Sequence, residues 1–135
     1  MAKKMNLENR VISPGFVNQK ELNLLYSQSI ALVMPTYFGP TNIPPLEAFK
    51  LNTPVLYSNL PGLKDQVGDA ALLLDLNNPR SLVQNLKILL NSSELRNNLI
   101  KNGRLRLAEL NFEQKKLDIL KNIIKKFKIL RDCWQ

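Results

Sequence analysis

Four short apolar runs along the chain predict β-strands. They cover residues 11–12, 30–34, 54–57 and 70–74. The second run, Ile-Ala-Leu-Val-Met, contains no polar side chain, which is typical of a strand covered on both faces in a parallel sheet. The first run is followed by Pro14, which cannot donate a ladder hydrogen bond. The pattern therefore predicts an edge strand or a strand end there, extending at most to residue 17.

Segments with helical patterning separate and follow these strands. Asn18, with Glu21 three residues later, resembles a capping box, which predicts that a helix opens here and continues to about residue 29. Further helices are predicted over residues 44–51, 63–67, 78–90, 93–110 and 112–130. Strands that alternate with helices indicate an α/β fold with a parallel sheet of about four strands and flanking helices.

We expect the 135 residues to form a single domain with one core. Residues 1–9 are interpreted as an N-terminal tail, 10–110 as the α/β core and 111–135 as a closing basic helix. The last two helices are expected to cover one face and one edge of the sheet. Leucine, isoleucine and phenylalanine recur at helical spacing in the closing helix, and we interpret this stripe as core packing. Its members are Leu117, Leu120, Ile124 and Phe127.

Positive charge is concentrated near the C-terminus. The formal net charge is +8. Residues 1–100 carry nine basic and seven acidic side chains, whereas residues 101–135 carry ten and four. A solvated helix face and attraction to an anionic membrane surface both account for this excess. Nucleic-acid binding is not expected, because no zinc finger, recognition helix or basic groove with interleaved aromatic residues accompanies the charge.

Several classes of chemistry are disfavoured by composition. The chain has one cysteine, Cys133, and no histidine, so we expect no internal disulfide, no histidine acid–base catalysis and no ordinary zinc site. The acidic residues form no tight cluster in the sequence, and no metal or cofactor is implied. No apolar run reaches the roughly 18 residues of a membrane span, and residues 1–6 do not resemble a signal peptide. We expect a cytoplasmic protein, with peripheral membrane contact as one alternative.

Candidate chemistry gathers in the segment at 35–49, which reads PTYFGPTNIPPLEAF. It joins a predicted strand to a helix through small and polar residues, and this is how α/β folds present backbone N–H groups to phosphate. Thr41, Asn42 and Ile43 precede the helix, where the helix dipole favours a diphosphate. Glu47 is expected in the first turn, where a carboxylate accepts two hydrogen bonds from a cis-diol. The alternative is that Glu47 only favours the helix start and binds nothing.

These motifs, in this order, resemble the second half of the nucleotide-sugar domain of retaining GT-B glycosyltransferases of the group 1 type. That family carries two donor-site glutamates separated by seven residues. The resemblance implies a partial Rossmann-like sheet, the C-terminal half of the donor domain. The matching residues are Gly15, Leu25-Tyr26, Pro35-Thr36, Ile43-Pro44-Pro45-Leu46-Glu47-Ala48, Thr53-Pro54-Val55, Pro61-Gly62, Val67 to Ala71, Leu74-Asp75 and Asn111-Phe112.

The resemblance implies a role for each matching site residue. Glu47 aligns with the second glutamate, which in the family binds the nucleotide ribose. The position of the first glutamate is Gly39, so contact with the donor sugar is either absent or supplied by backbone groups and Asn42. Thr41, Asn42 and Ile43 align with backbone donors to the sugar or diphosphate. Gly15, Phe16 and Val17 align with the turn beside the nucleotide base.

The implied activity is transfer of a sugar from a nucleoside-diphosphate sugar to an acceptor hydroxyl with retention of configuration. The family has an acceptor domain and two strand–helix units before this region, so no catalytic residue is assigned here. We expect the chain either to pair residues 11–12 with 30–34, or to associate with a partner that carries the missing half. The competing hypotheses are an inactive remnant or nucleotide-binding module without transfer, and a basic interaction protein at an anionic membrane.

Overall fold

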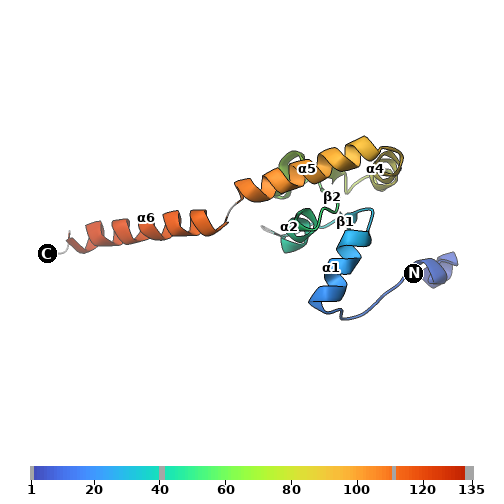
Figure 1. The fold of residues 1–135 in the computed structure, drawn as a ribbon, viewed down its shortest axis with the longest axis horizontal. Coiled ribbons are helices and arrows are strands. Elements are labelled where there is room, and N and C mark those ends of the chain that lie inside the picture. Colours follow the sequence, from blue (N-terminus) through green and yellow to red (C-terminus); the bar gives the residue numbers. More distant parts are fainter. Residues whose placement is uncertain (1, 40–41, 111, 133–135) are drawn as a thin grey trace.

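The structure, a computed structural model, describes residues 2–39, 42–110 and 112–132. It confirms the α/β fold, with a parallel sheet flanked by helices (Figure 1). The strands are β1 (Leu32–Met34), β2 (Val55–Ser58) and β3 (Ala71–Leu74), in the order β1-β2-β3. In register, Val33 lies opposite Leu56, and Leu56 lies opposite Leu72. The described sheet thus has three strands, where about four were predicted.

The helices begin and end close to the predicted positions. The Asn18 side chain accepts hydrogen bonds from the backbone N–H groups of Lys20 and Glu21, and the Asn18 N–H donates to the Glu21 carboxylate at 2.8 Å. This confirms the predicted capping box. The α-helices are α1 (Gln19–Gln28), α2 (Ile43–Lys50), α3 (Leu63–Val67), α4 (Arg80–Asn91), α5 (Ser93–Glu109) and α6 (Phe112–Asp132); short 3-10 helices cover Ala2–Met5, Glu8–Arg10 and Gly68–Ala70.

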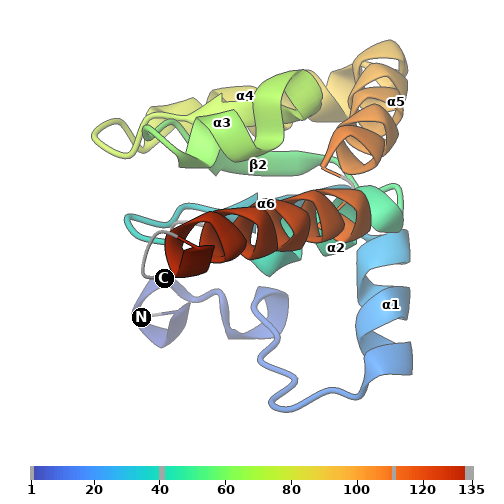
Figure 2. The same cartoon turned by 90° about the vertical axis from the view of Figure 1, so that its left-hand side faces the viewer.

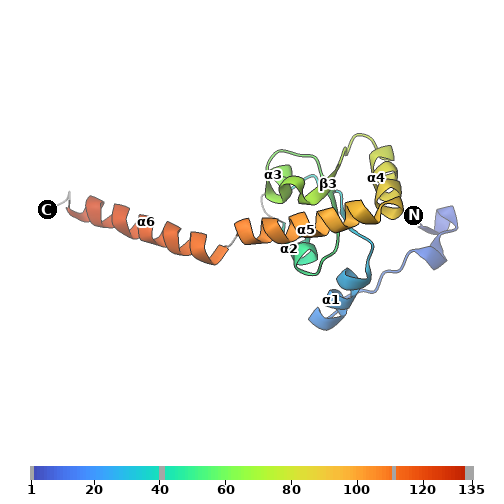
Figure 3. The ribbon, with the colours of Figure 1, turned by 45° about the horizontal axis from the view of Figure 1, so that its top comes forward.

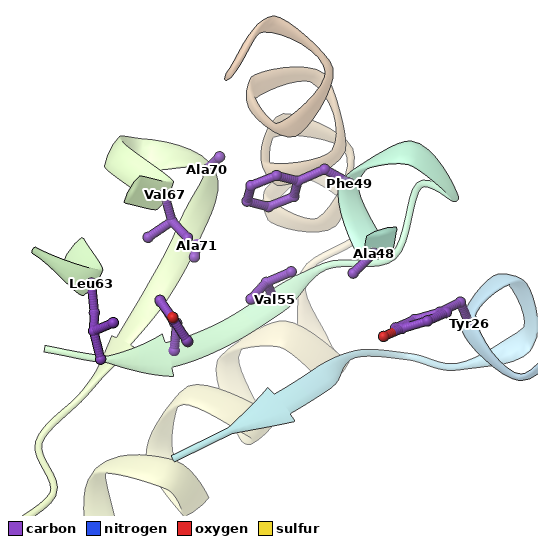
Figure 4. Packing of buried hydrophobic residues seen from close by; sticks show 9 residues of the cluster. Tyr26, Ala48, Phe49, Val55, Leu63, Val67, Ala70 and Ala71 are labelled. Carbon is purple, nitrogen blue, oxygen red and sulfur yellow. The ribbon is translucent and has the colours of Figure 1, made fainter. Parts of the chain in front are cut away.

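The core lies on both faces of β2, whose four residues are all buried. Val55 and Tyr57 point to one face and pack with side chains of α1, α2 and α3, as Figure 4 shows for several of them. Leu56 points to the other face and packs with Leu89 of α4 and Leu99 of α5. This alternation is the period of two that a strand imposes on its side chains. The central strand therefore joins two apolar layers.

The predicted strand at residues 11–12 is not formed. Val11 and Ile12 have no regular structure and are 57% and 85% exposed. The N-terminal segment runs apart from the sheet (Figure 2), and β1 pairs only with β2 among the described strands. A strand needs a neighbour for its N–H and C=O groups, and here none lies beside residues 11–12. The expectation that this segment pairs with residues 30–34 is therefore wrong.

The interpretation of the α6 stripe as core packing is also wrong. Leu117, Leu120, Ile124 and Phe127 are each more than half exposed. Helix α6 extends away from the domain body (Figures 1 and 3). The physical reason is that side chains of α1 to α5 already bury both faces of β2, and neither core cluster includes a residue of α6. Of the two closing helices, only α5 packs on the body, against α2 and α4.

Candidate functional site

The segments that follow the three strands meet at one edge of the sheet, because the strands are parallel. This carboxyl edge is where open α/β sheets bind ligands. The loop after β1 and the loop after β2 form a hollow there, and Tyr37 lies between it and a second hollow beside the end of β3. The first hollow is lined by Tyr37, Phe38, Gly39, Leu60, Pro61 and Leu63.

Glu47 lies on α2, half-buried and facing α1. Glu47 was expected in the first turn of this helix. Because α2 begins at Ile43, Glu47 is its fifth residue and lies beyond the first turn, so this expectation is wrong. The Tyr26 hydroxyl, from α1, donates a hydrogen bond to Glu47 Oε2 at 3.3 Å. Glu47 borders a hollow between α1 and α2. The hollow is lined by Gln19, Asn23, Glu47, Lys50 and Leu51.

The Tyr26 hydroxyl is a hydrogen-bond donor to this carboxylate. Burial of the ring, the charge of Glu47 and the hydrogen bond between them, in that order, raise the pKa of Tyr26 to about 12. The phenol therefore remains protonated at neutral pH and donates. No described residue donates to the other carboxylate oxygen, Oε1. One side of Glu47 is thus held by the protein, and the other can accept hydroxyl groups of a ligand.

Asn42 is held at the start of α2 by two residues from other elements. The Gln66 amide pairs with the Asn42 backbone: it accepts from the Asn42 N–H at 3.2 Å and donates to the Asn42 carbonyl at 2.6 Å. The Asn42 side-chain amide donates to the buried Tyr57 hydroxyl, which donates to Gln66 Oε1 at 3.3 Å. This network joins the loop after β1 to β2 and to α3.

The network limits which predicted backbone donors are available at the start of α2. The Asn42 N–H is bonded to Gln66, and Pro44 and Pro45 carry no N–H group. No hydrogen bond joins the Ile43 N–H to another residue in the described part of the chain. Among residues 42–45, the backbone N–H of Ile43 is therefore the group that can donate a hydrogen bond to an anion.

Gly39 has a backbone conformation that other residues rarely adopt. Its φ is +136°, and a Cβ atom added there would overlap the side-chain amide of Asn42. The space next to Gly39 is thus filled by the Asn42 side chain. This explains in physical terms why no carboxylate stands at this position: a glutamate does not fit while Asn42 is bonded to Tyr57.

The residues predicted near the nucleotide base lie apart from Glu47. Gly15 adopts a positive φ of +70°, and Phe16 is 98% exposed. Phe16 and Val17 border a different hollow, on the face of α1 that carries Leu24 and Gln28. The Glu47 hollow lies on the opposite face of α1, so the structure does not bring these two groups into one cavity. Thr41 and Cys133 lie outside the described residues.

Sequence reasoning assigned no role to Tyr26 and missed Tyr57 and Gln66. Their contacts with Glu47 and Asn42 join positions 21, 15 and 24 residues apart, and no local pattern reports such contacts. Over the described residues, no group of three His, Cys, Asp or Glu side chains is placed to hold a metal ion. In the same part of the chain, none of the helices has both the length and the apolar character needed to span a membrane.

Comparison with known proteins agrees with this architecture. The family model of glycosyl transferases group 1 matches residues 1–106. An O-antigen chain mannosyltransferase of Salmonella typhimurium is 33% identical over 81 residues, which is 60% of this chain and 23% of that protein. O-antigen chain mannosyltransferase B of Escherichia coli is 36% identical over 63 residues, 47% of this chain and 16% of that protein. The chain therefore spans less than a quarter of the length of either relative.

The fold is similar to a solved structure as well. Sucrose-phosphate synthase from Thermosynechococcus elongatus superposes with a TM-score of 0.82 and 28% sequence identity, over 93% of this chain and 32% of that one. The sequence match, the parallel sheet and the loop at its carboxyl edge agree with one another. This chain belongs to the group 1 glycosyltransferases, a family of GT-B fold.

Proposed function

We propose that this chain supplies the nucleotide-sugar donor site of a retaining glycosyltransferase. The observation that carries the proposal is Glu47: it projects from α2 into a polar hollow, and Tyr26 holds one of its oxygens. A carboxylate held in this way is suited to accept two hydrogen bonds from the ribose diol of a nucleotide. The family of the chain supports the same assignment.

The start of α2 is suited to the diphosphate of the donor. The Ile43 N–H and the helix dipole favour negative charge there. During transfer the bond between the sugar and the diphosphate breaks, and negative charge grows on the departing phosphate. Donors that are already in position stabilise this charge without reorganisation. Gly39 offers no side chain to the sugar, so we propose that backbone groups of the loop make this contact.

We further propose that the active enzyme needs a protein part that carries the acceptor site, either a partner chain or an additional region. The chain spans 23% of its mannosyltransferase relative, and the outer edge of β1 pairs with no described strand. Apolar side chains line a hollow beside this edge, among them Leu25, Ala31 and Val33. An unpaired edge with apolar neighbours favours addition of further strands.

Titration calorimetry with uridine, guanosine and adenosine diphosphates tests the donor site. Glu47→Gln keeps the size of the side chain and removes its charge. We expect it to weaken the best-bound nucleotide about tenfold, or about 1.4 kcal/mol, because a charged acceptor is replaced by a neutral amide. The matched control is Glu94→Gln on the exposed first turn of α5, which should bind as wild type does. Equal affinity of Glu47→Gln and wild type would contradict the assignment.

A second candidate is a nucleotide-binding module without transfer, and the observation that favours it is Gly39 at the first-glutamate position. The two functions differ in their products. With the completing protein part present, a donor and an acceptor alcohol, the transferase releases nucleoside diphosphate and a glycoside of retained anomeric configuration, which proton NMR detects. Nucleotide binding without any glycoside product would support the module.

A further inference from the structure

Helix α6 has a wide apolar arc that no part of the described body covers. At about 100° per residue, seven large apolar side chains fall within roughly 160° of the helix circumference. Each of them is more than half exposed: Leu117, Ile119, Leu120, Ile123, Ile124, Phe127 and Leu130. Exposed apolar area of this extent marks an interaction surface.

Lysines border this arc on both sides. Lys121 and Lys128 lie next to one border and Lys126 next to the other, while Lys125 lies on the polar face. Lys116 and Arg131 fall at the two ends of the arc, one residue before its first apolar side chain and one after its last. Residues 116–131 contain six basic side chains and one acidic side chain, Asp118, a net charge of +5. The surface therefore combines an apolar centre with a positive rim.

The rim argues against a second copy of the chain as the occupant. If two α6 helices paired through their apolar arcs, the bordering lysines of one copy would face those of the other. Like charges at such flanking positions oppose pairing. The arc also extends over nearly half of the circumference, wider than the seam of a two-helix coiled coil. An anionic occupant with a broad apolar interior fits both features.

We propose that α6 lies in the plane of an anionic lipid membrane. Its apolar arc enters the boundary between headgroups and acyl chains, and the lysine rim contacts lipid phosphates. A basic amphipathic helix with a wide apolar face is typical of such interfacial binding. Lysine side chains at the borders extend their stems along the apolar region and keep the ammonium groups at the phosphates. This inference is independent of the donor site, so Glu47→Gln should bind membranes as wild type does.

Flotation of the full chain with lipid vesicles tests the proposal. We expect binding to vesicles of mixed phosphatidylcholine and phosphatidylglycerol and at least about tenfold weaker binding to phosphatidylcholine alone, because the negative surface attracts the basic side chains of α6. Raising the salt from about 0.05 M to about 0.5 M should weaken binding to the mixed vesicles, since the Debye length falls severalfold.

Three variants separate the apolar and the charged contributions. Ile124→Asn with Phe127→Asn interrupts the arc, and Lys121→Gln with Lys126→Gln and Lys128→Gln weakens the rim; each should lower binding to mixed vesicles by about tenfold or more. The control removes the same charge from exposed lysines of the body, Lys20→Gln, Lys64→Gln and Lys87→Gln. It should bind like wild type.

Thermal unfolding shows whether each variant keeps its fold, which we expect because α6 does not pack on the core. Absence of wild-type binding to mixed vesicles at low salt would overturn the proposal and favour an acidic protein partner. Equal loss of binding in the α6 lysine variant and in its body control would also overturn it, since the effect would then be one of net charge.

Discussion

At the scale of single residues, the site depends on how neighbouring groups hold two side chains. Tyr26 donates to Glu47, and the Tyr57–Gln66 pair holds Asn42. In both cases a group from another element restricts a polar residue of α2 or of its cap. Restricted groups lose less conformational entropy when a ligand binds. The supporting residues are therefore as important for the proposed donor site as Glu47 itself.

The Tyr26–Glu47 pair makes stability depend on pH in the alkaline range. The folded-state pKa of Tyr26, about 12, lies above the ordinary value of 10. The neutral phenol is thus favoured in the folded protein, and this contribution is present below pH 10 and is lost as the pH rises towards 12. A shift of this size corresponds to at most about 3 kcal/mol.

Tyr26→Phe tests this linkage by urea unfolding at several pH values. At pH 8 we expect the variant to be about 1 kcal/mol less stable, because the partly buried hydrogen bond to Glu47 is lost. Between pH 10 and pH 12 wild type alone loses the contribution of Tyr26, so the stability difference between the two proteins should fall to zero or reverse in sign. A stability difference that stays constant over this range would contradict a coupled pair.

Gly39 and Asn42 should be energetically coupled. Gly39→Ala places a Cβ against the Asn42 side chain in a left-handed conformation, so we expect a loss of about 2 kcal/mol in the free energy of unfolding. The control is Gly15→Ala, which has a positive φ but no atom within 4 Å of the new Cβ. It should cost about 1 kcal/mol.

The coupling itself is measured in the background of Asn42→Ala. There, Gly39→Ala should cost no more than the Gly15 control, because the crowding atoms are gone. If the cost of Gly39→Ala is the same with and without the Asn42 side chain, crowding does not explain the glycine.

At the scale of elements, the helices were predictable because their signals are local. The capping box of α1 and the diproline of α2 fall where the structure places them. The strand at residues 11–12 was predicted wrongly, because a strand depends on a neighbour far away in sequence. The α6 stripe has helical periodicity, and periodicity gives the orientation of an apolar face without saying what covers it.

The contact between α2 and α5 depends on a glycine that helix propensity disfavours. A Cβ on Gly103 lies 2.8 Å from the ring of Phe49, which is 2% exposed. Alanine stabilises a helix by up to about 1 kcal/mol relative to glycine, but overpacking costs about 1–3 kcal/mol. We therefore expect Gly103→Ala to destabilise the fold on balance, as measured by urea unfolding.

The matched measurement repeats Gly103→Ala in the background of Phe49→Leu. The smaller side chain leaves room, so the cost of the alanine should fall there, and the gain in helix propensity should become visible. A Gly103→Ala variant that is more stable than wild type would show that α2 and α5 are packed less closely than in this structure.

For the whole molecule, the described residues form a three-stranded parallel sheet, and the chain spans less than a quarter of the length of its mannosyltransferase relatives. Family, fold and the loop 35–49 were predictable from motif order, and the comparisons confirm the group 1 family. The position of residues 15–17 relative to Glu47 was not predictable, because among the described strands β1 pairs with β2 alone and residues 11–17 join no strand.

We propose that a nucleotide binds between Glu47 and the start of α2 at Ile43. Two-dimensional amide NMR of the 135-residue chain, titrated with the best-bound nucleoside diphosphate, tests this proposal. We predict shifts that saturate together at Asn42, Ile43 and Glu47, with smaller shifts at Tyr26, and their loss in Glu47→Gln. Shifts confined to α6, or no shift around α2 at saturating nucleotide, would contradict the account.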